Sequence, residues 1–188
     1  FREASEDTQR LQNIFRKLMR FTAFVSFPAM LGLAIVSQEL IVISITEKWL
    51  PCVPVMQILC VWGAFMPIST LYSNLMNSIG RPNIYMWNTI ALGIFQLLCV
   101  WGSYPYGLNV MLIVYTAANI FWLLIWHYFA HKHIGISLFN TLKDIAPYLI
   151  ISVAVMTFTY WVAGYVKNIY LSLLVKVALA ASLYIFLM

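Results

Sequence analysis

The chain has 188 residues, of which 63% are hydrophobic and 17 are charged (11 Lys or Arg and 6 Asp or Glu). Eight of these charges fall in the first twenty residues, so the other 168 residues carry nine. Soluble domains carry charge on about a quarter of their positions, and disordered chains combine high charge with low hydrophobicity. The composition excludes both classes and predicts an all-α polytopic transmembrane helical bundle.

Residues 1–20 are predicted to form an amphipathic helix at the cytoplasmic surface of the membrane. Leu11, Ile14, Phe15 and Leu18 recur at helical spacing, and polar residues cover the opposite face. We expect this helix to continue directly into the first span.

About six spans are predicted, because an uncharged apolar run of about twenty residues is needed to cross the hydrocarbon core. Membrane strands are excluded because these runs do not alternate between polar and apolar residues. Residues 21–128 are expected to form four transmembrane helices, 129–145 a cytoplasmic loop, and 146–188 a trailing helix pair. The predicted spans are 21–45, 53–77, 85–103, 108–128, 146–164 and 170–188.

Two charged residues, Glu39 and Lys176, fall inside predicted spans. Charges within a bilayer are costly and suggest functional sites, but both lie within about 9 Å of a span end. We expect Lys176 to extend its ammonium group toward the membrane surface. For Glu39, a substrate site and an edge position both remain open.

Lys and Arg are distributed unequally between the two sides of the membrane. With six spans, one side carries eight of them and the other side carries two, Lys48 and Lys167. The richer side is expected to be cytoplasmic and includes both chain ends. Because the chain opens with Phe1 and ends without a polar tail, we expect it to be a piece of a longer protein.

Polar residues follow one face of the second predicted span. Thr70, Ser73, Asn74 and Asn77 are spaced i, i+3, i+4 and i+7, so their side chains point the same way. Gln96 lies on a similar face of the third span. Such faces either line a wet interior or make hydrogen bonds between helices, and the sequence leaves both readings open.

No cofactor site, metal site or catalytic pair is predicted. His127, His131 and His133 lack the carboxylate or cysteine partners of common metal motifs and are expected to be interfacial side chains. The basic surplus is expected to face the lipid bilayer, because an exposed basic groove for nucleic acid is missing.

Several short motifs follow one another between Pro28 and Pro82, and their order and spacing resemble the polysaccharide transporter family. This family comprises the Wzx-like flippases for O-antigen, capsule and exopolysaccharide repeat units. Tyr106-Gly107-Leu108 also fits the family. The motifs are Pro28-Ala29-Met30-Leu31-Gly32-Leu33-Ala34, Gln38-Glu39-Leu40-Ile41, Thr46-Glu47-Lys48-Trp49-Leu50-Pro51, Val55-Met56-Gln57-Ile58-Leu59-Cys60 and Asn77-Ser78-Ile79-Gly80-Arg81-Pro82.

The resemblance implies membership of the multidrug/oligosaccharidyl-lipid/polysaccharide exporter superfamily, whose MATE-like proteins have two helical lobes around a central cavity. The chain would be the last two-fifths of such a protein, and its partner would be the missing N-terminal lobe of the same protein. The implied substrate is an undecaprenyl-diphosphate-linked oligosaccharide, moved across the bacterial inner membrane without enzymatic chemistry.

This reading gives the predicted site residues two roles. The polar stripe with Gln96 would meet the glycan, and a basic cytoplasmic rim of Arg16, Lys17, Arg20 and Arg81 would attract the diphosphate. Two alternative functions remain open from the sequence. One is a cation-coupled drug or metabolite extruder of the same superfamily, and the other is an integral-membrane glycosyl- or acyltransferase using Asp144 and the histidines.

Overall fold

The computed structural model describes residues 2–163 and 169–187. Six of its helices are long and apolar enough to cross a membrane, and the described residues contain no strand, which confirms the all-α polytopic bundle. The ends predicted at 164 and 188, and the loop residue Lys167, lie outside the described residues. The long helices are α1 (Arg2–Ser44), α2 (Val53–Ser78), α3 (Pro82–Ser103), α4 (Leu108–Ile134), α5 (Leu138–Ala163) and α6 (Ile169–Leu187), and the short 3₁₀ helices are η1 (Glu47–Cys52) and η2 (Tyr104–Tyr106).

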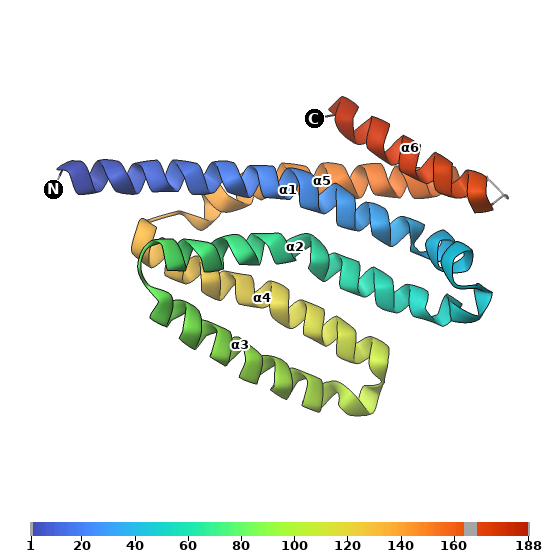
Figure 1. Cartoon of the computed structure of the whole chain (residues 1–188), viewed down its shortest axis with the longest axis horizontal. Coiled ribbons are helices and arrows are strands. Elements are labelled where there is room, and N and C mark those ends of the chain that lie inside the picture. Colours follow the sequence, from blue (N-terminus) through green and yellow to red (C-terminus); the bar gives the residue numbers. More distant parts are fainter. Residues whose placement is uncertain (1, 164–168, 188) are drawn as a thin grey trace.

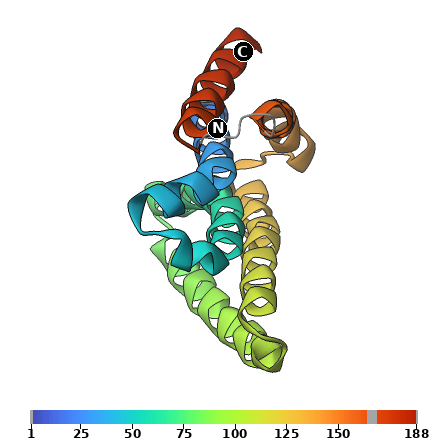
Figure 2. The same ribbon diagram turned by 90° about the vertical axis from the view of Figure 1, so that its right-hand side faces the viewer.

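The first long helix, α1, lies in the middle of the bundle. It packs on α2 along one side and on α5 and α6 along another, while α4 and then α3 lie beyond α2 (Figures 1 and 2). The predicted surface helix and first span are therefore one continuous helix. The trailing helices α5 and α6 pack against this first span.

The core between α1, α2 and α4 repeats every four residues along α1. Phe15, Met19, Ala23 and Phe27 are all buried there. Since lipid tails are as apolar as these side chains, helix association in a membrane depends on close packing and interhelical hydrogen bonds. One such bond joins Ser26 Oγ to the Ala64 carbonyl oxygen at 2.8 Å.

The exposure of α3 is reversed relative to a helix in a soluble protein. Its buried residues are Asn88 and Ser103, whereas Trp87, Leu97 and Trp101 are 66%, 72% and 80% exposed. The Asn88 side chain accepts a hydrogen bond from Trp122 Nε1 of α4 at 2.9 Å. Polar groups inside and large apolar groups outside are the arrangement expected of a helix that faces lipid.

The segment 129–145, predicted as a loop, is helical except for residues 135–137. Gly135 ends α4 with a left-handed backbone (φ 73°), and the Gln12 side-chain amide donates to the Ile134 carbonyl oxygen. Ile136 is buried beside Ile134 in the core. The helices extend through this segment because their polar residues occupy exposed faces while an apolar face still packs inward.

Candidate functional site

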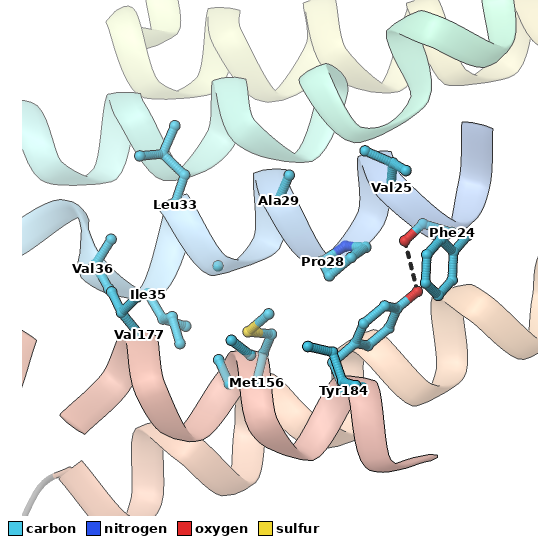
Figure 3. A pocket seen from close by; sticks show the side chains of 14 residues that line it. Phe24, Val25, Pro28, Ala29, Leu33, Ile35, Val36, Met156, Val177 and Tyr184 are labelled. Atoms are coloured by element: carbon cyan, nitrogen blue, oxygen red, sulfur yellow. Dashed lines mark hydrogen bonds between the residues drawn. The ribbon is translucent and has the colours of Figure 1, made fainter. Parts of the chain in front are cut away.

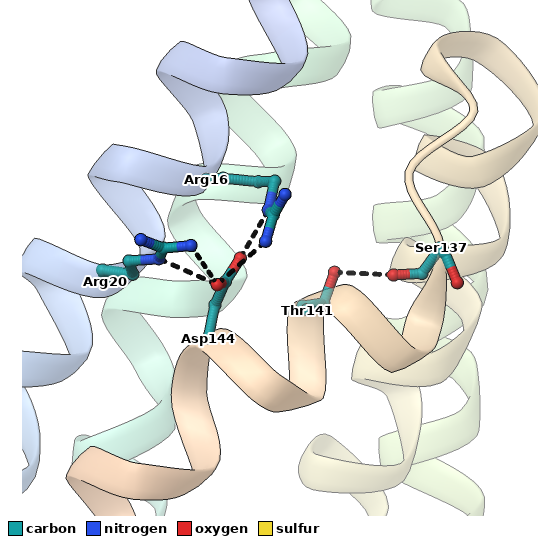
Figure 4. A network of polar contacts seen from close by, with 5 residues as sticks. All are labelled: Arg16, Arg20, Ser137, Thr141 and Asp144. Atoms are coloured by element: carbon teal, nitrogen blue, oxygen red, sulfur yellow. Dashed lines mark hydrogen bonds and ion pairs between the residues drawn. The ribbon is translucent and has the colours of Figure 1, made fainter.

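Three charged side chains from two helices meet at the N-terminal half of α1. Arg16 and Arg20 are one helical turn apart and both face Asp144 of α5 (Figure 4). Arg16 donates from Nε to Asp144 Oδ2 at 2.6 Å and from Nη2 to Oδ1 at 3.1 Å. Arg20 donates from Nε to Asp144 Oδ1 at 2.8 Å and lies 2.6 Å from the same oxygen through Nη2.

The exposure of these groups differs sharply. The Asp144 side chain is 4% exposed, while those of Arg16 and Arg20 are 32% and 48% exposed. A guanidinium group has five N–H donors. Asp144 accepts from Nε and Nη2 of Arg16 and from Nε of Arg20, and Arg20 Nη2 makes an ion pair with the same carboxylate. The carboxylate therefore fixes both guanidinium groups in place, and their remaining N–H groups can bind another anion.

A polar cavity of about 360 Å³ opens beside this cluster. Arg16, Arg20 and Lys143 supply three cations to its wall, against the single carboxylate of Asp144. Fixed arginine forks favour planar or tetrahedral oxyanions such as carboxylates and phosphates. This cavity has the charge and donor geometry of an anion site. The full lining is Arg16, Arg20, Asn140, Lys143, Asp144, Pro147 and Tyr148.

The predicted basic rim is only partly gathered into this cavity. Arg16 and Arg20 line it, but Lys17 is exposed on α1, and Arg81 is exposed immediately before α3. Neither Lys17 nor Arg81 is part of the cavity wall. The third cation in the wall is Lys143, which was not among the residues predicted from the sequence.

The predicted polar stripe lies along α2. Thr70, Asn74 and Asn77 are exposed, and Ser73 is half-buried. The two hydroxyl groups donate within their own helix, Thr70 to the Met66 carbonyl at 3.1 Å and Ser73 to the Ser69 carbonyl at 3.2 Å. The surface that α2 offers to a partner therefore carries mainly the side-chain amides of Asn74 and Asn77.

Gln96 is separated from this stripe by its own hydrogen bond. Its Nε2 donates to Asn119 Oδ1 of α4 at 2.7 Å, and Asn119 Nδ2 donates in turn to the Tyr115 carbonyl at 2.8 Å. Of the two readings that the sequence left open, the structure gives Gln96 a role in holding α3 on α4.

The expectation that Lys176 extends to the membrane surface is wrong. Lys176 and Glu39 are 6% and 7% exposed and form an ion pair between α6 and α1. Lys176 Nζ also donates to the Ile35 carbonyl at 3.0 Å and lies 5.6 Å from the centre of the Tyr160 ring. Ser172 Oγ donates to Glu39 Oε1 at 3.0 Å. Each charge is neutralised within the bundle, so neither side chain needs to reach water.

His127 is also buried, in contrast to its predicted interfacial position. Its Nδ1 lies 3.1 Å from the hydroxyl oxygen of Tyr72, which joins α4 to α2. His131 is exposed, and its Nδ1 lies 2.9 Å from the Ile136 carbonyl oxygen at the turn that follows α4. These contacts give His127 and His131 structural partners at the end of the bundle.

A family described as "Polysaccharide biosynthesis protein" matches residues 1–54 of the chain. The lipopolysaccharide biosynthesis protein WzxC of Escherichia coli (strain K12) is 31% identical over 96 residues, which cover 50% of the chain and 20% of that relative. An uncharacterized membrane protein in the cps region of Klebsiella pneumoniae is 31% identical over 91 residues, or 48% and 19% of the two chains. Together these matches support a Wzx-like polysaccharide transporter family.

The chain spans about a fifth of the length of these two relatives. No solved structure matches it. The part matched by the polysaccharide family contains Arg16, Arg20 and Glu39, whereas their partners Asp144 and Lys176 lie far outside it. These three ion pairs thus join helix α1, which lies in the matched part of the chain, to the trailing helices α5 and α6.

Asp144 is the site residue that the sequence reading missed as an ion-pair partner. It is the one acidic residue after Lys48, and Arg16 and Arg20 are arginines one helical turn apart on a single face of α1. In the structure its carboxylate is buried inside the bundle, where a charge needs a partner of opposite sign. The i, i+4 spacing of Arg16 and Arg20 indicates that the two arginines can share one carboxylate, but it does not indicate that α5 supplies it.

Proposed function

We propose that the chain is part of a flippase that moves undecaprenyl-diphosphate-linked oligosaccharides from the cytoplasmic to the periplasmic leaflet of the bacterial inner membrane. The product would supply the synthesis of surface polysaccharide, such as lipopolysaccharide or capsule. The observation that carries this proposal is the cavity whose wall carries the three cations Arg16, Arg20 and Lys143 and the single, buried carboxylate of Asp144. A diphosphate is the part of such a substrate that these three cations would recognise.

The distribution of basic residues supports the proposed orientation. The start of α1, the α2–α3 turn with Arg81 and the α4–α5 turn lie toward one end of the bundle, and η1 with Lys48 lies at the other (Figure 1). An excess of Lys and Arg favours the cytoplasmic side. The anion cavity would then receive its substrate from the leaflet in which lipid-linked repeat units are made.

The exposed amides of Asn74 and Asn77 would face the glycan in the intact transporter. They lie on an open surface of α2, where a second helical lobe of the same protein would complete a central cavity. Hydrogen-bonding amides suit sugar hydroxyl groups, which both donate and accept. Thr70 and Ser73 flank them on the same stripe.

Flipping of a lipid-linked oligosaccharide is proposed in preference to the extruder and the transferase. The intramembrane carboxylate that a cation-coupled extruder would use, Glu39, is held by Lys176. The carboxylate and histidine considered for a transferase, Asp144 and His127, have structural partners in Arg16 and Tyr72. Neither alternative is favoured by a contact among the described residues.

The proposal is tested by deleting the full-length gene and complementing the deletion strain. We expect lipid-linked repeat units to be synthesised but to remain facing the cytoplasm, and surface polysaccharide to be lost. Their orientation is measured with a membrane-impermeant reagent that modifies the glycan. Normal surface polysaccharide in the deletion strain would contradict the proposed function.

A charge reversal tests the anion cavity within the same assay. Lys143→Glu places a carboxylate in the cavity without removing either arginine from Asp144, so the diphosphate is repelled. We expect it to restore surface polysaccharide severalfold less well than the wild type at equal protein level. Lys132→Glu is the matched control, because Lys132 is an exposed lysine of α4 outside the cavity.

A further inference from the structure

A groove of about 530 Å³ runs between α1, α5 and α6 (Figure 3). Its wall is made almost entirely of apolar side chains, including Phe24, Pro28 and Val36 of α1, Met156 of α5 and Val177 of α6. Ligand sites typically have volumes of about 300–1,000 Å³ and mostly apolar walls, so the groove has the size and chemistry of a binding site.

The groove is elongated along the helix axes. Its lining on α1 extends from Phe24 to Val36, which corresponds to about 18 Å at 1.5 Å per residue. The hydrocarbon core of a bilayer is about 30 Å thick. Val25, Val177 and Ile185 line the groove and are 49%, 55% and 74% exposed, so its side is open. A long hydrocarbon chain lying across the membrane could enter from the side.

Gly32 and Ala29 line the groove with little or no side chain, which leaves space between the helices. A Cβ atom at Gly32 would lie 3.4 Å from Met156 Cε, so the α5 side chain occupies the space directly above this glycine. Ala29 lines the groove with a single methyl group on an exposed part of α1. Larger side chains at these positions would fill the groove.

The apolar groove and the cationic cavity share an aromatic wall. Phe24 lines the groove and Tyr148 lines the cavity, and their rings meet edge to face with centroids 6.2 Å apart. Tyr184 of α6 completes this wall by donating from its hydroxyl group to the Phe24 carbonyl at 2.8 Å. Arg20, which lines the cavity, is one helical turn before Phe24.

We infer that the two cavities together bind one lipid, with its hydrocarbon chain in the α1–α5–α6 groove and its diphosphate beside Arg16, Arg20 and Lys143. The inference rests on the proposed function for the identity of the lipid, a polyisoprenyl diphosphate. Charge favours this occupant: the three cations exceed the one carboxylate by two, and a diphosphate carries more negative charge than the single phosphodiester of a phospholipid.

The Glu39–Lys176 ion pair lies next to one end of the groove. Lys176 adjoins the lining residue Val177 and donates to the carbonyl of Ile35, another lining residue. Because Lys176 binds Glu39 of α1 at this end and Tyr184 binds Phe24 at the other, α6 is attached to α1 by polar contacts at both ends of the groove. The groove lies between these two attachments.

The experiment uses the full-length protein in nanodiscs of phosphatidylethanolamine, labelled with a photoreactive geranylgeranyl diphosphate. We expect labelled peptides from residues 24–36 and from α6, and at least tenfold less labelling when Ala29→Trp and Ala181→Trp fill the groove. Ala178→Trp is the matched control, because Ala178 is exposed on α6 and does not line the groove. The labelling of the Ala178→Trp variant should be within twofold of that of the wild type.

Competition in the wild-type protein tests the occupant without any substitution. Unlabelled geranylgeranyl diphosphate should displace the probe at least tenfold better than inorganic diphosphate, which lacks the chain, or phosphatidylglycerol, which carries one phosphodiester. Equal displacement by phosphatidylglycerol would identify a general lipid site and overturn the inference. Equal displacement by inorganic diphosphate, or labelling that the two tryptophans leave unchanged, would also overturn it.

Different results would refute the lipid site in the groove and the proposed flippase function. Normal surface polysaccharide in the deletion strain refutes flipping, whatever the labelling shows. Conversely, if the deletion strain loses surface polysaccharide but labelling fails as described above, flipping stands and the chain-binding groove is refuted.

Discussion

Removing the ammonium group of Lys176 should weaken the attachment of α6 to α1. Lys176→Met keeps the length of the apolar stem but leaves Glu39, 7% exposed, as an unpaired carboxylate inside the bundle. Breaking a buried ion pair from one side costs about 3–5 kcal/mol. Insertion measurements for one charge at the centre of a membrane helix give about 2.5–3.5 kcal/mol, so we expect a loss near 3 kcal/mol.

The double variant Glu39→Gln/Lys176→Met separates the cost of the unpaired charge from the loss of packing. It removes both charges, and the glutamine can still accept a hydrogen bond from Ser172. Replacement of a whole buried pair is often close to neutral, so most of the loss should be recovered. The free energy of unfolding of the full-length protein in detergent, followed by tryptophan fluorescence, gives the comparison.

Two results would refute this reasoning. If Lys176→Met changes stability by less than about 0.5 kcal/mol, as most surface substitutions do, the side chain reaches water and the ion pair contributes nothing. If the double variant is as unstable as the single one, the loss comes from packing around the lysine stem and not from the buried carboxylate.

Two further stability predictions concern the predicted cytoplasmic end. Asp144→Asn should lower the free energy of unfolding by about 1–3 kcal/mol. This is less than the loss for a fully buried pair, because both arginine partners are partly exposed. The control is Glu47→Gln, which changes an exposed carboxylate and should alter the free energy of unfolding by less than about 0.5 kcal/mol. Gly135→Ala should lower the free energy of unfolding by about 1 kcal/mol, because the left-handed φ of 73° at this position disfavours a side chain. The same unfolding assay measures this loss. An unchanged free energy of unfolding would mean that the turn after α4 does not depend on this residue.

The number and positions of the spans were predictable because the bilayer imposes a length on each one. Apolar runs of about twenty residues needed no knowledge of their neighbours, and the structure confirms six such helices among the described residues. The continuity of residues 5–19 with the first span followed from helical spacing of the kind seen at Phe15 and Leu18. These signals are local, so a single sequence contains them.

The pairing of helices could not be predicted in the same way. In a membrane the outer and inner faces of a helix are both apolar, so hydropathy does not indicate which face meets a neighbour. Asp144 and Arg16 are 128 positions apart, and Glu39 and Lys176 are 137 apart. The position of α5 and α6 on α1 creates both pairs, and no local pattern gives that position. For the same reason Gln96 was predicted to meet the glycan, although its side chain donates a hydrogen bond to Asn119 of α4.

Val25 and Ala29 of α1 form a ridge between two grooves, one on the α6 side of α1 and one on the α2 side. Val25 and Ala29 line the groove shared with α6, and they also line a second groove of about 410 Å³ that α1 forms with Gly63 and Pro67 of α2. The polar stripe of α2 begins at Thr70, one helical turn after Pro67. If the lipid chain lies in the first groove and the glycan along the stripe, the substrate must cross this ridge, and the methyl group of Ala29 is the smallest obstacle there. Ala29→Trp would then impair both chain binding and passage of the glycan, whereas Ala181→Trp, on α6, would impair chain binding alone.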